Sequence, residues 1–105
     1  MPYDILERPF SWIHLIDTLQ VLTHRGVLHT VTINRPDVGG GALISVYDVA
    51  DAGDILPANL IANITMDDAF FVVPTTLTYN IGFANGLYII FSAGMTTGDI
   101  TVSYK

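Results

Sequence analysis

The sequence predicts an all-β protein, an antiparallel β-sandwich that is jelly-roll-like and has about seven or eight strands. The first observation is an alternation of apolar and polar residues with a period of two, which begins in Gly26–Asn34 and recurs around Tyr79, Ile89 and Val102. This period is typical of antiparallel strands with one buried and one solvated face. The second observation is the regular spacing of Gly, Pro, Asn and Asp turn residues between these short runs. We therefore expect almost no helix.

The length and composition of the chain describe one folded unit. A chain of 105 residues has the size of one domain and buries about 65% of its unfolded surface, which suffices for a core. It has no cysteine, so no disulfide contributes to stability. We expect an N-terminal arm at residues 1–10 and a single β-sandwich domain at residues 11–105. Pro2 and Pro9 bracket the arm, which is too short for a stable helix.

The first strands of the domain are expected at Ser11–Ile16 and at Leu19–Thr23, with a break at Asp17-Thr18. An α-helix over Ile13–Leu22 is the local alternative, because several apolar residues in it have helical spacing. The β-branched residues and threonine weigh modestly against the helix. Both interpretations stay open from the sequence.

A long strand, Val27–Asn34, is expected after the turn at His24-Arg25-Gly26. The alternation places Val27 and Val31 on one face of this strand and the threonines on the other. His29 shares the face of the two valines. A hydrogen-bonded, half-buried histidine is therefore the favoured interpretation of His29, ahead of a metal ligand.

Two further strands are expected at Ala42–Val49 and Leu60–Thr65, with a turn that begins at Asp51–Asp54. A loop, Arg35–Gly41, precedes them, because its proline fixes φ and its glycines allow positive φ. The glycines at 39–41 lack the Lys-Ser/Thr pair that completes a phosphate-binding loop, and a strand follows them where such a loop needs a helix. No nucleotide site is predicted there.

The C-terminal part of the chain is expected to form three more strands. Met66–Pro74 is expected to be a crossing connection, followed by strands at Thr76–Phe83, Leu87–Ser92 and Asp99–Tyr104. The first two of these are expected to pair as a hairpin. The turn between them contains Asn85-Gly86, and this dipeptide is the strongest short hairpin signal because both residues tolerate positive φ.

The charge of the chain argues against two classes of partner. The net charge is −6, and the four lysines and arginines are scattered along the sequence, whereas nucleic-acid binding needs clustered cations. Residues 69–98 carry no charge, but Pro, Gly and Asn interrupt them, so a membrane span is not expected. We expect no nucleic-acid and no membrane partner. A weakly charged, apolar chain is unusual for a free monomer, which points to an interface.

Three histidines and a set of loop aspartates are the candidates for metal or acid–base chemistry. A catalytic zinc needs three convergent ligands, and nothing in the spacing of the histidines produces such convergence. The aspartates recur every third residue and offer oxygen ligands for calcium, but their spacing does not match the helix-loop-helix motif. Solvation of the turn is favoured, and we expect no enzyme, no catalytic residue, no metal and no cofactor. The candidate histidines and loop aspartates are His14, His24 and His29, and Asp48, Asp51 and Asp54.

The apolar residues of the arm are the predicted partner-binding site. A short segment between prolines cannot bury its own apolar side chains, so it docks on a neighbour or on its own sheet. Trp and Tyr are also the commonest anchor residues of protein interfaces. The predicted docking element consists of Tyr3, Ile5, Leu6, Phe10 and Trp12.

Five ordered segments of the chain resemble one family. They are Gly26–Asn34 (GVLHTVTIN), Ile44–Asp48 (ISVYD), Pro74–Asn80 (PTTLTYN), Gly86–Ser92 and Asp99–Tyr104 (DITVSY). Together they resemble a small β-sandwich virion structural protein of tailed bacteriophages, of the capsid decoration or cement type. The resemblance implies a non-enzymatic protein, with no catalytic residues to carry over. It also implies binding to the outer capsid lattice, through the major capsid protein or other virion proteins, as a symmetric homo-oligomer.

The same resemblance implies a location on the capsid surface of the virion, after synthesis in the host cytoplasm. An alternative function stays open, because similar modules occur in tails and fibres. In that case the chain is a tail or fibre module that binds a host carbohydrate or receptor, with its loop aromatics and the acidic loop Asp48–Asp54.

Overall fold

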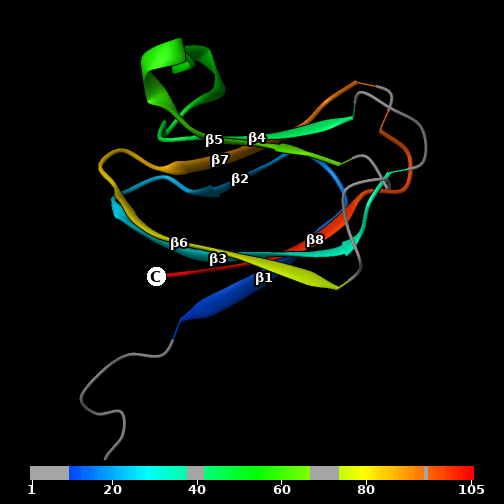
Figure 1. The fold of residues 1–105 in the computed structure, drawn as a ribbon. Coiled ribbons are helices and arrows are strands. Elements are labelled where there is room, and N and C mark those ends of the chain that lie inside the picture. The colour runs from blue at the N-terminus through cyan, green and yellow to red at the C-terminus, as the bar shows by residue number, and fades with distance from the viewer. Residues whose placement is uncertain (1–9, 38–41, 67–73, 94) are drawn as a thin grey trace, which may run out of the picture.

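The computed structural model describes residues 10–37, 42–66, 74–93 and 95–105. It contains two four-stranded antiparallel sheets that face each other across one core (Figure 1). The predicted all-β sandwich is confirmed. The strands are β1 (Ser11–Leu15), β2 (Leu19–Leu22), β3 (Gly26–Arg35), β4 (Leu43–Tyr47), β5 (Leu60–Thr65), β6 (Thr75–Phe83), β7 (Leu87–Phe91) and β8 (Asp99–Tyr104).

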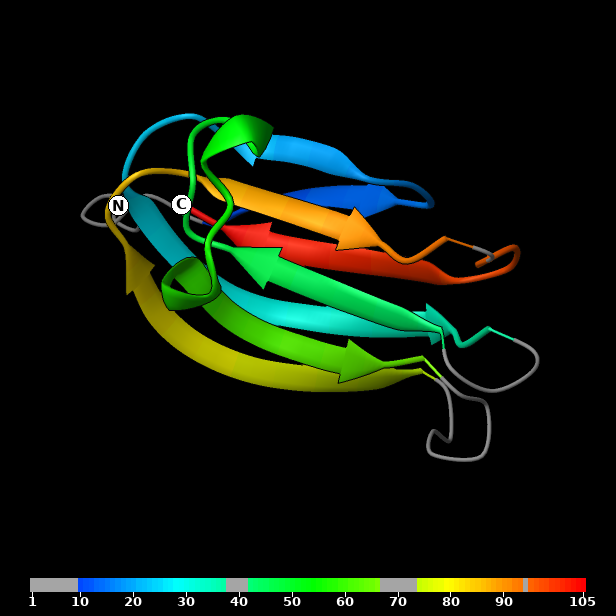
Figure 2. The same ribbon diagram turned by 90° about the horizontal axis from the view of Figure 1, so that it is seen from above.

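The strand order is that of a jelly roll. Sheet A has the order β1-β8-β3-β6 and sheet B has the order β2-β7-β4-β5. The β4–β5 connection joins two paired strands of sheet B. All the remaining connections between consecutive strands pass from one sheet to the other. As a result, β1 and β2 lie along one side of the sandwich, and β5 and β6 lie along the opposite side (Figure 2).

This topology contradicts the predicted hairpin at Asn85-Gly86. β6 pairs with β3 in sheet A, and β7 pairs with β2 and β4 in sheet B, so β6 and β7 share no ladder. The carboxylate of Asp48, at the end of β4, accepts the backbone N–H groups of Ala84, Asn85 and Gly86. These bonds hold the turn as a crossing between the sheets. A tertiary contact has overridden a local turn preference.

The core lies between the sheets, where the inward residues of each strand meet. The predicted alternation is confirmed in β4, β7 and β8, whose alternate apolar residues are buried. Among the described residues, ten hydrophobic side chains are almost or completely inaccessible, each less than 2% exposed, and they are the main source of the hydrophobic stabilisation. They are Leu28, Val31, Ile33, Ile44, Val46, Met66, Leu87, Ile89, Ile100 and Val102.

The predicted alternation of β3 is wrong at Val27 because the strand contains a β-bulge. The register of β3 shifts between Leu28 and Thr30 against both of its neighbours. Leu28 and Val31 are therefore both buried, and Val27 is not the inward residue. One extra residue resets the alternation, so the predicted grouping of Val27 and Val31 on one face is wrong. The favoured interpretation of His29 itself is confirmed, because its side chain is half-buried and hydrogen-bonded to Asn80. On the β6 side the bulge includes Asn80, with a φ of 52°.

The helix alternative for Ile13–Leu22 is wrong, because β1 and β2 occupy this segment. β1 pairs with β8 and β2 pairs with β7, so the two strands belong to different sheets. A hydrogen bond to β7 fixes the break between them, since the Thr18 hydroxyl accepts the Phe91 N–H at 2.9 Å. The tertiary partners of both strands decide in favour of β-structure.

The β4–β5 connection contains two short 3₁₀ helices, η1 (Ala52–Asp54) and η2 (Pro57–Asn59). The turn predicted at Asp51–Asp54 coincides with η1. Most of the predicted crossing connection, Met66–Pro74, lies outside the described residues, as do the glycines at 39–41. In the described parts of the chain, no helix is long and apolar enough to span a bilayer.

Candidate functional site

Only part of the predicted docking element falls within the described residues, namely Phe10 and Trp12. The Phe10 ring stacks on the His29 imidazole, with ring centroids 4.1 Å apart and an interplanar angle of 12°. The Lys105 ammonium lies 4.5 Å from the centroid of the same ring, within reach of a cation–π interaction. Phe10 is thus held on its own sheet. Tyr3, Ile5 and Leu6 lie outside the described residues.

Trp12, in contrast, presents its indole to solvent. It lies on the edge strand β1 and is 70% exposed. Ile16, in the β1–β2 connection, is equally exposed, and Leu19 of β2 is 38% exposed. On the opposite side of the sandwich, Leu60 of β5 and Ile81 of β6 are also exposed. Apolar surface therefore lies along both edges, which we call the β1–β2 side and the β5–β6 side.

The outer face of sheet A is a regular array of uncharged polar side chains. Directly paired residues share a face of an antiparallel sheet, and the register places Ser103, Thr30 and Thr78 in one row across β8, β3 and β6. A second row, one pleat further along, contains Thr101, Thr32 and Thr76. We call these six residues the hydroxyl array.

The edge strand β1 extends both rows of the hydroxyl array by one residue. Trp12 pairs with Ser103 and His14 pairs with Thr101. The sequence contains a signal for this array that the analysis of single residues missed. Each of the three strands contributes a hydroxyl–apolar–hydroxyl tripeptide, namely Thr30-Val-Thr32, Thr76-Leu-Thr78 and Thr101-Val-Ser103.

Hydrogen bonds orient the side chains of this face. The Thr30 and Ser103 hydroxyls are 2.6 Å apart, and those of Thr32 and Thr76 are 2.9 Å apart. Asn34 donates its amide to the Thr101 hydroxyl at 3.0 Å. Ser103 Oγ also accepts the Thr30 backbone N–H at 3.2 Å. The array is therefore a set of oriented hydroxyls, and in each pair one O–H group is not used by the bond within the pair.

A histidine–carboxylate pair closes one end of the array. His14 donates from Nε2 to Oδ1 of Asp99 at 2.6 Å, and Asn34 donates to the same oxygen at 3.0 Å. The His14 side chain is 53% exposed and that of Asp99 is 22% exposed. At this exposure an ion pair contributes little to stability, but the pair fixes the orientation of both side chains.

The outer face of sheet B has a different character. On β4, Leu43 and Tyr47 alternate with the buried residues, and on β7 Tyr88 and Ile90 do the same. Tyr47 pairs directly with Tyr88. These aromatic and aliphatic side chains are half-buried. Ser45, between Leu43 and Tyr47, donates to the Asn63 side chain at 2.7 Å. The outer face of sheet B therefore combines aromatic and aliphatic side chains with polar ones, whereas the hydroxyl array on sheet A is entirely polar.

The loop aspartates act as backbone acceptors. Asp51 accepts the Gly53 N–H at 3.1 Å and caps η1. Asp48 accepts three N–H groups from the β6–β7 turn, at 2.7 to 3.2 Å. Burial raises the pKa of Asp48, but the backbone donors of Ala84, Asn85 and Gly86 outweigh it and hold the pKa below its usual range.

A buried aspartate that the sequence analysis treated only as part of a loop is Asp37. Its side chain is 4% exposed, and its Oδ1 accepts the N–H groups of Thr97 at 2.8 Å and Thr96 at 3.0 Å. The Thr97 hydroxyl donates to the same oxygen at 2.9 Å. The bonds from Thr97 and then Thr96 hold the pKa of Asp37 below its ordinary value. Asp37 ties the end of β3 to the β7–β8 connection.

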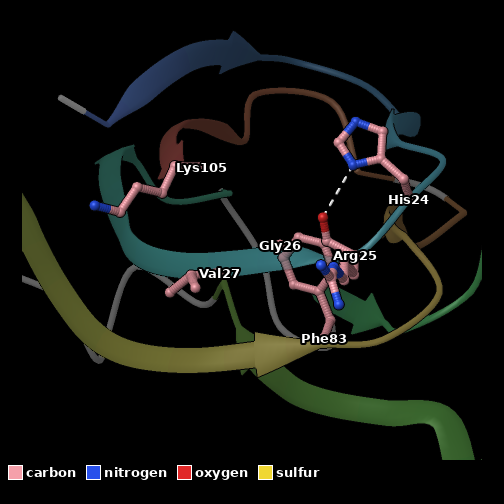
Figure 3. Close-up of a pocket in the computed structure, with 6 residues that line it drawn as sticks. All are labelled: His24, Arg25, Gly26, Val27, Phe83 and Lys105. Carbon is pink, nitrogen blue, oxygen red and sulfur yellow. Dashed lines mark hydrogen bonds between the residues drawn. The ribbon is translucent and has the colours of Figure 1, made fainter. Parts of the chain in front are cut away.

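A hollow of about 420 Å³ opens at the end of sheet A (Figure 3). Within its lining, Gly26 packs closely against the Phe83 ring, since a β-carbon there would lie 2.8 Å from Cζ of Phe83. His24 donates from Nδ1 to the Arg25 carbonyl at 2.9 Å, and the Lys105 ammonium points away from the other residues in Figure 3. The cationic groups do not converge, so the hollow has no built anion site. Its lining is His24, Arg25, Gly26, Val27, Phe83 and Lys105.

The three histidines lie in different environments. His14 bonds Asp99, His24 bonds a backbone carbonyl, and His29 donates from Nδ1 to the Asn80 side-chain oxygen at 2.5 Å. Across the described ranges, no group of three or more His, Cys, Asp or Glu side chains is placed to hold a metal ion. The surface features that distinguish this molecule are the exposed apolar residues on its two sides and the hydroxyl array beside Trp12.

Comparisons of the chain with protein-family models, with curated proteins and with solved structures found no match.

Proposed function

We propose that this protein is a non-enzymatic structural protein of a tailed-bacteriophage particle, a capsid decoration protein that binds the outer capsid lattice as a symmetric oligomer. The five segments that resemble such proteins support the proposal, and so does the jelly-roll topology, which capsid domains share with lectins and cupins. The partner in this proposal is the major capsid protein or another virion protein.

The single observation that carries the proposal is the placement of exposed apolar residues on two opposite sides of one molecule. Ile16 and Leu19 lie on the β1–β2 side, and Leu60 and Ile81 lie on the β5–β6 side. Trp12 is not part of this contact, because its pairing with Ser103 places it on the outer face of sheet A. Contacts between two different sides of identical copies are head-to-tail, and such contacts produce a closed ring when the rotation closes. A ring of this kind matches the local symmetry of a capsid lattice.

The N-terminal arm is the proposed link to the capsid. Phe10 is anchored on His29 and Lys105, so the arm starts from a fixed point on the outer face of sheet A. Weak contacts of each arm then add up over the copies of a ring, since linked sites raise the effective concentration.

The oligomer is tested by native mass spectrometry of the full chain. We expect one closed ring, and we expect Ile16→Ser to shift the population to monomer. Leu56→Ser is the matched control, because Leu56 is 61% exposed but lies in the β4–β5 connection. A monomeric wild-type chain would exclude the ring.

The position on the virion is tested by an electron-microscopy reconstruction of the native particle. We expect jelly-roll density on the outer capsid surface, and density only in the tail or fibre would refute the decoration function. Deletion of residues 1–10 is expected to leave the far-UV circular dichroism of a folded β-protein and to abolish incorporation into particles. Normal incorporation of the truncated chain would show that the arm is not the link.

A further inference from the structure

We infer that the outer face of sheet A is a binding site for a neutral oligosaccharide, with Trp12 as the stacking platform and the hydroxyl array as the hydrogen-bonding surface. This inference goes beyond the proposed function, because a decoration protein needs no ligand besides the capsid. It assigns a ligand class to a surface distinct from the loop Asp48–Asp54, whose first two aspartates are occupied by backbone donors.

The first argument is the chemistry of the array. Its six side chains are hydroxyls, each of which both donates and accepts, and none carries a charge. Neutral donors and acceptors suit the hydroxyl groups of sugars, whereas phosphate or sulfate groups would require lysine or arginine. The array therefore favours a neutral sugar over a charged one.

The second argument is the position of Trp12. Its pairing with Ser103 places the indole in the same row as Ser103, Thr30 and Thr78. A pyranose ring has an apolar C–H face and a polar rim, so it stacks on an aromatic ring and directs its hydroxyls to neighbouring polar groups. An indole that is 70% exposed at the end of a row of hydroxyls supplies both requirements on one surface.

The third argument is size and preorganisation. A row that crosses four strands is about 14 Å long, because neighbouring strands are about 4.8 Å apart, which is enough for a short oligosaccharide. The cross-strand pairs Thr30 with Ser103 and Thr32 with Thr76 hold their hydroxyls in place before a ligand arrives. Binding then costs little side-chain entropy.

The contrast with sheet B shows that this polarity is not a general property of the fold. The corresponding outward positions of β4 and β7 include Leu43, Tyr47, Tyr88 and Ile90. Aromatic and aliphatic side chains such as these are typical of the centre of a protein–protein interface. All six residues of the hydroxyl array are polar, and the aromatic rings beside them are Trp12 on the edge strand and Phe10, which is stacked on His29.

The experiment uses the full chain and a printed array of neutral and acidic glycans. Hits are then titrated in solution as free oligosaccharides. The chain has one tryptophan, so its fluorescence reports directly on Trp12. We expect binding of neutral glycans with a change in tryptophan emission, and we expect Trp12→Ala to weaken binding about tenfold or more.

A second variant separates this site from the capsid-binding function. The double substitution Thr32→Val/Thr101→Val removes two hydroxyls but keeps the shape and the β-branching of the side chains. It is expected to weaken glycan binding about tenfold and to leave particle incorporation unchanged. Thr65→Val is the matched control, because Thr65 is an exposed threonine of β5 in the other sheet, and it is expected to bind glycans like the wild type.

The outcomes are distinguishable. Absence of binding to every glycan on the array would overturn the inference without affecting the proposed function. Binding that is unchanged in both Trp12→Ala and the double variant would place the glycan site elsewhere and would also overturn it. Binding of acidic glycans alone would contradict the argument from the uncharged array.

Discussion

Replacement of Asp48 by alanine is expected to destabilise the fold, because this carboxylate holds the crossing between the sheets. It accepts Ala84 N–H at 2.9 Å through Oδ2, and Asn85 and Gly86 N–H at 2.7 and 3.2 Å through Oδ1. Hydrogen bonds to a charged group contribute about 1.5–3 kcal/mol each when fully formed and buried. The site is partly open to water, which replaces much of this, so we expect a loss of about 2–3 kcal/mol for Asp48→Ala.

The assay is urea and thermal unfolding followed by far-UV circular dichroism. For a domain of this size, the expected loss corresponds to a fall in the melting temperature of about 10 °C. Asp48→Asn keeps one acceptor oxygen without the charge and is expected to cost about 1 kcal/mol. Asp51→Ala is the control: it removes one bond, to Gly53 at 3.1 Å, at an exposed 3₁₀ helix, and is expected to cost about 0.5 kcal/mol.

The pH dependence provides a further check on the same residue. The folded-state pKa of Asp48 is lowered, so its stabilising contribution is fully present above the unfolded-state pKa of about 3.9 and is lost as the pH falls through the folded-state value. Asp48→Asn should therefore lose less stability than the wild type on acidification. If Asp48→Ala unfolds at the same urea concentration as Asp51→Ala, the reasoning about the crossing is refuted.

Three other substitutions test the core, a close backbone approach and the buried loop aspartate. Ile89→Ala, at a completely buried position, is expected to lower the free energy of unfolding by about 2–5 kcal/mol. The adjacent substitution Ile90→Ala, at a half-buried position, should lower it clearly less in the same urea titration. Equal losses would contradict the assignment of the two faces of β7. Gly26→Ala would place a β-carbon 2.8 Å from Cζ of Phe83 and against the Lys105 carbonyl, so we expect about 1–3 kcal/mol of destabilisation. The Val27 N–H donates to that carbonyl at 2.7 Å and should lose its hydrogen-exchange protection. Unchanged protection would contradict the proposed clash. Asp37→Asn removes a carboxylate whose pKa is lowered by the Thr97 and Thr96 donors, so the variant should be less stable than the wild type at neutral pH. This difference in the free energy of unfolding should shrink as the pH falls below about 4. A difference that is constant with pH would exclude a stabilising role of the Asp37 charge.

Local sequence patterns predicted which residues are buried wherever a strand is regular, because there the face of each residue follows from its position along the strand. The alternation in β4, β7 and β8 identified the buried residues because the two faces of a regular strand follow a strict period of two. The same reasoning failed for the faces of β3 at Val27, since a bulge in β3 is decided by the register of two neighbouring strands. It failed also for Asn85-Gly86, because the acceptor that holds this turn, Asp48, comes from another strand.

The sequence by itself determined the class of fold and the approximate positions of the strands. Only the tertiary structure decided which of those residues lie together. Trp12 and Thr30 share one row because β8 lies between their strands and pairs with both. Ile16 and Leu60 lie on opposite sides because β2 and β5 are the two edges of one sheet. The physical reason is that strand order and register depend on hydrogen bonds between segments far apart in the chain, which no local period encodes.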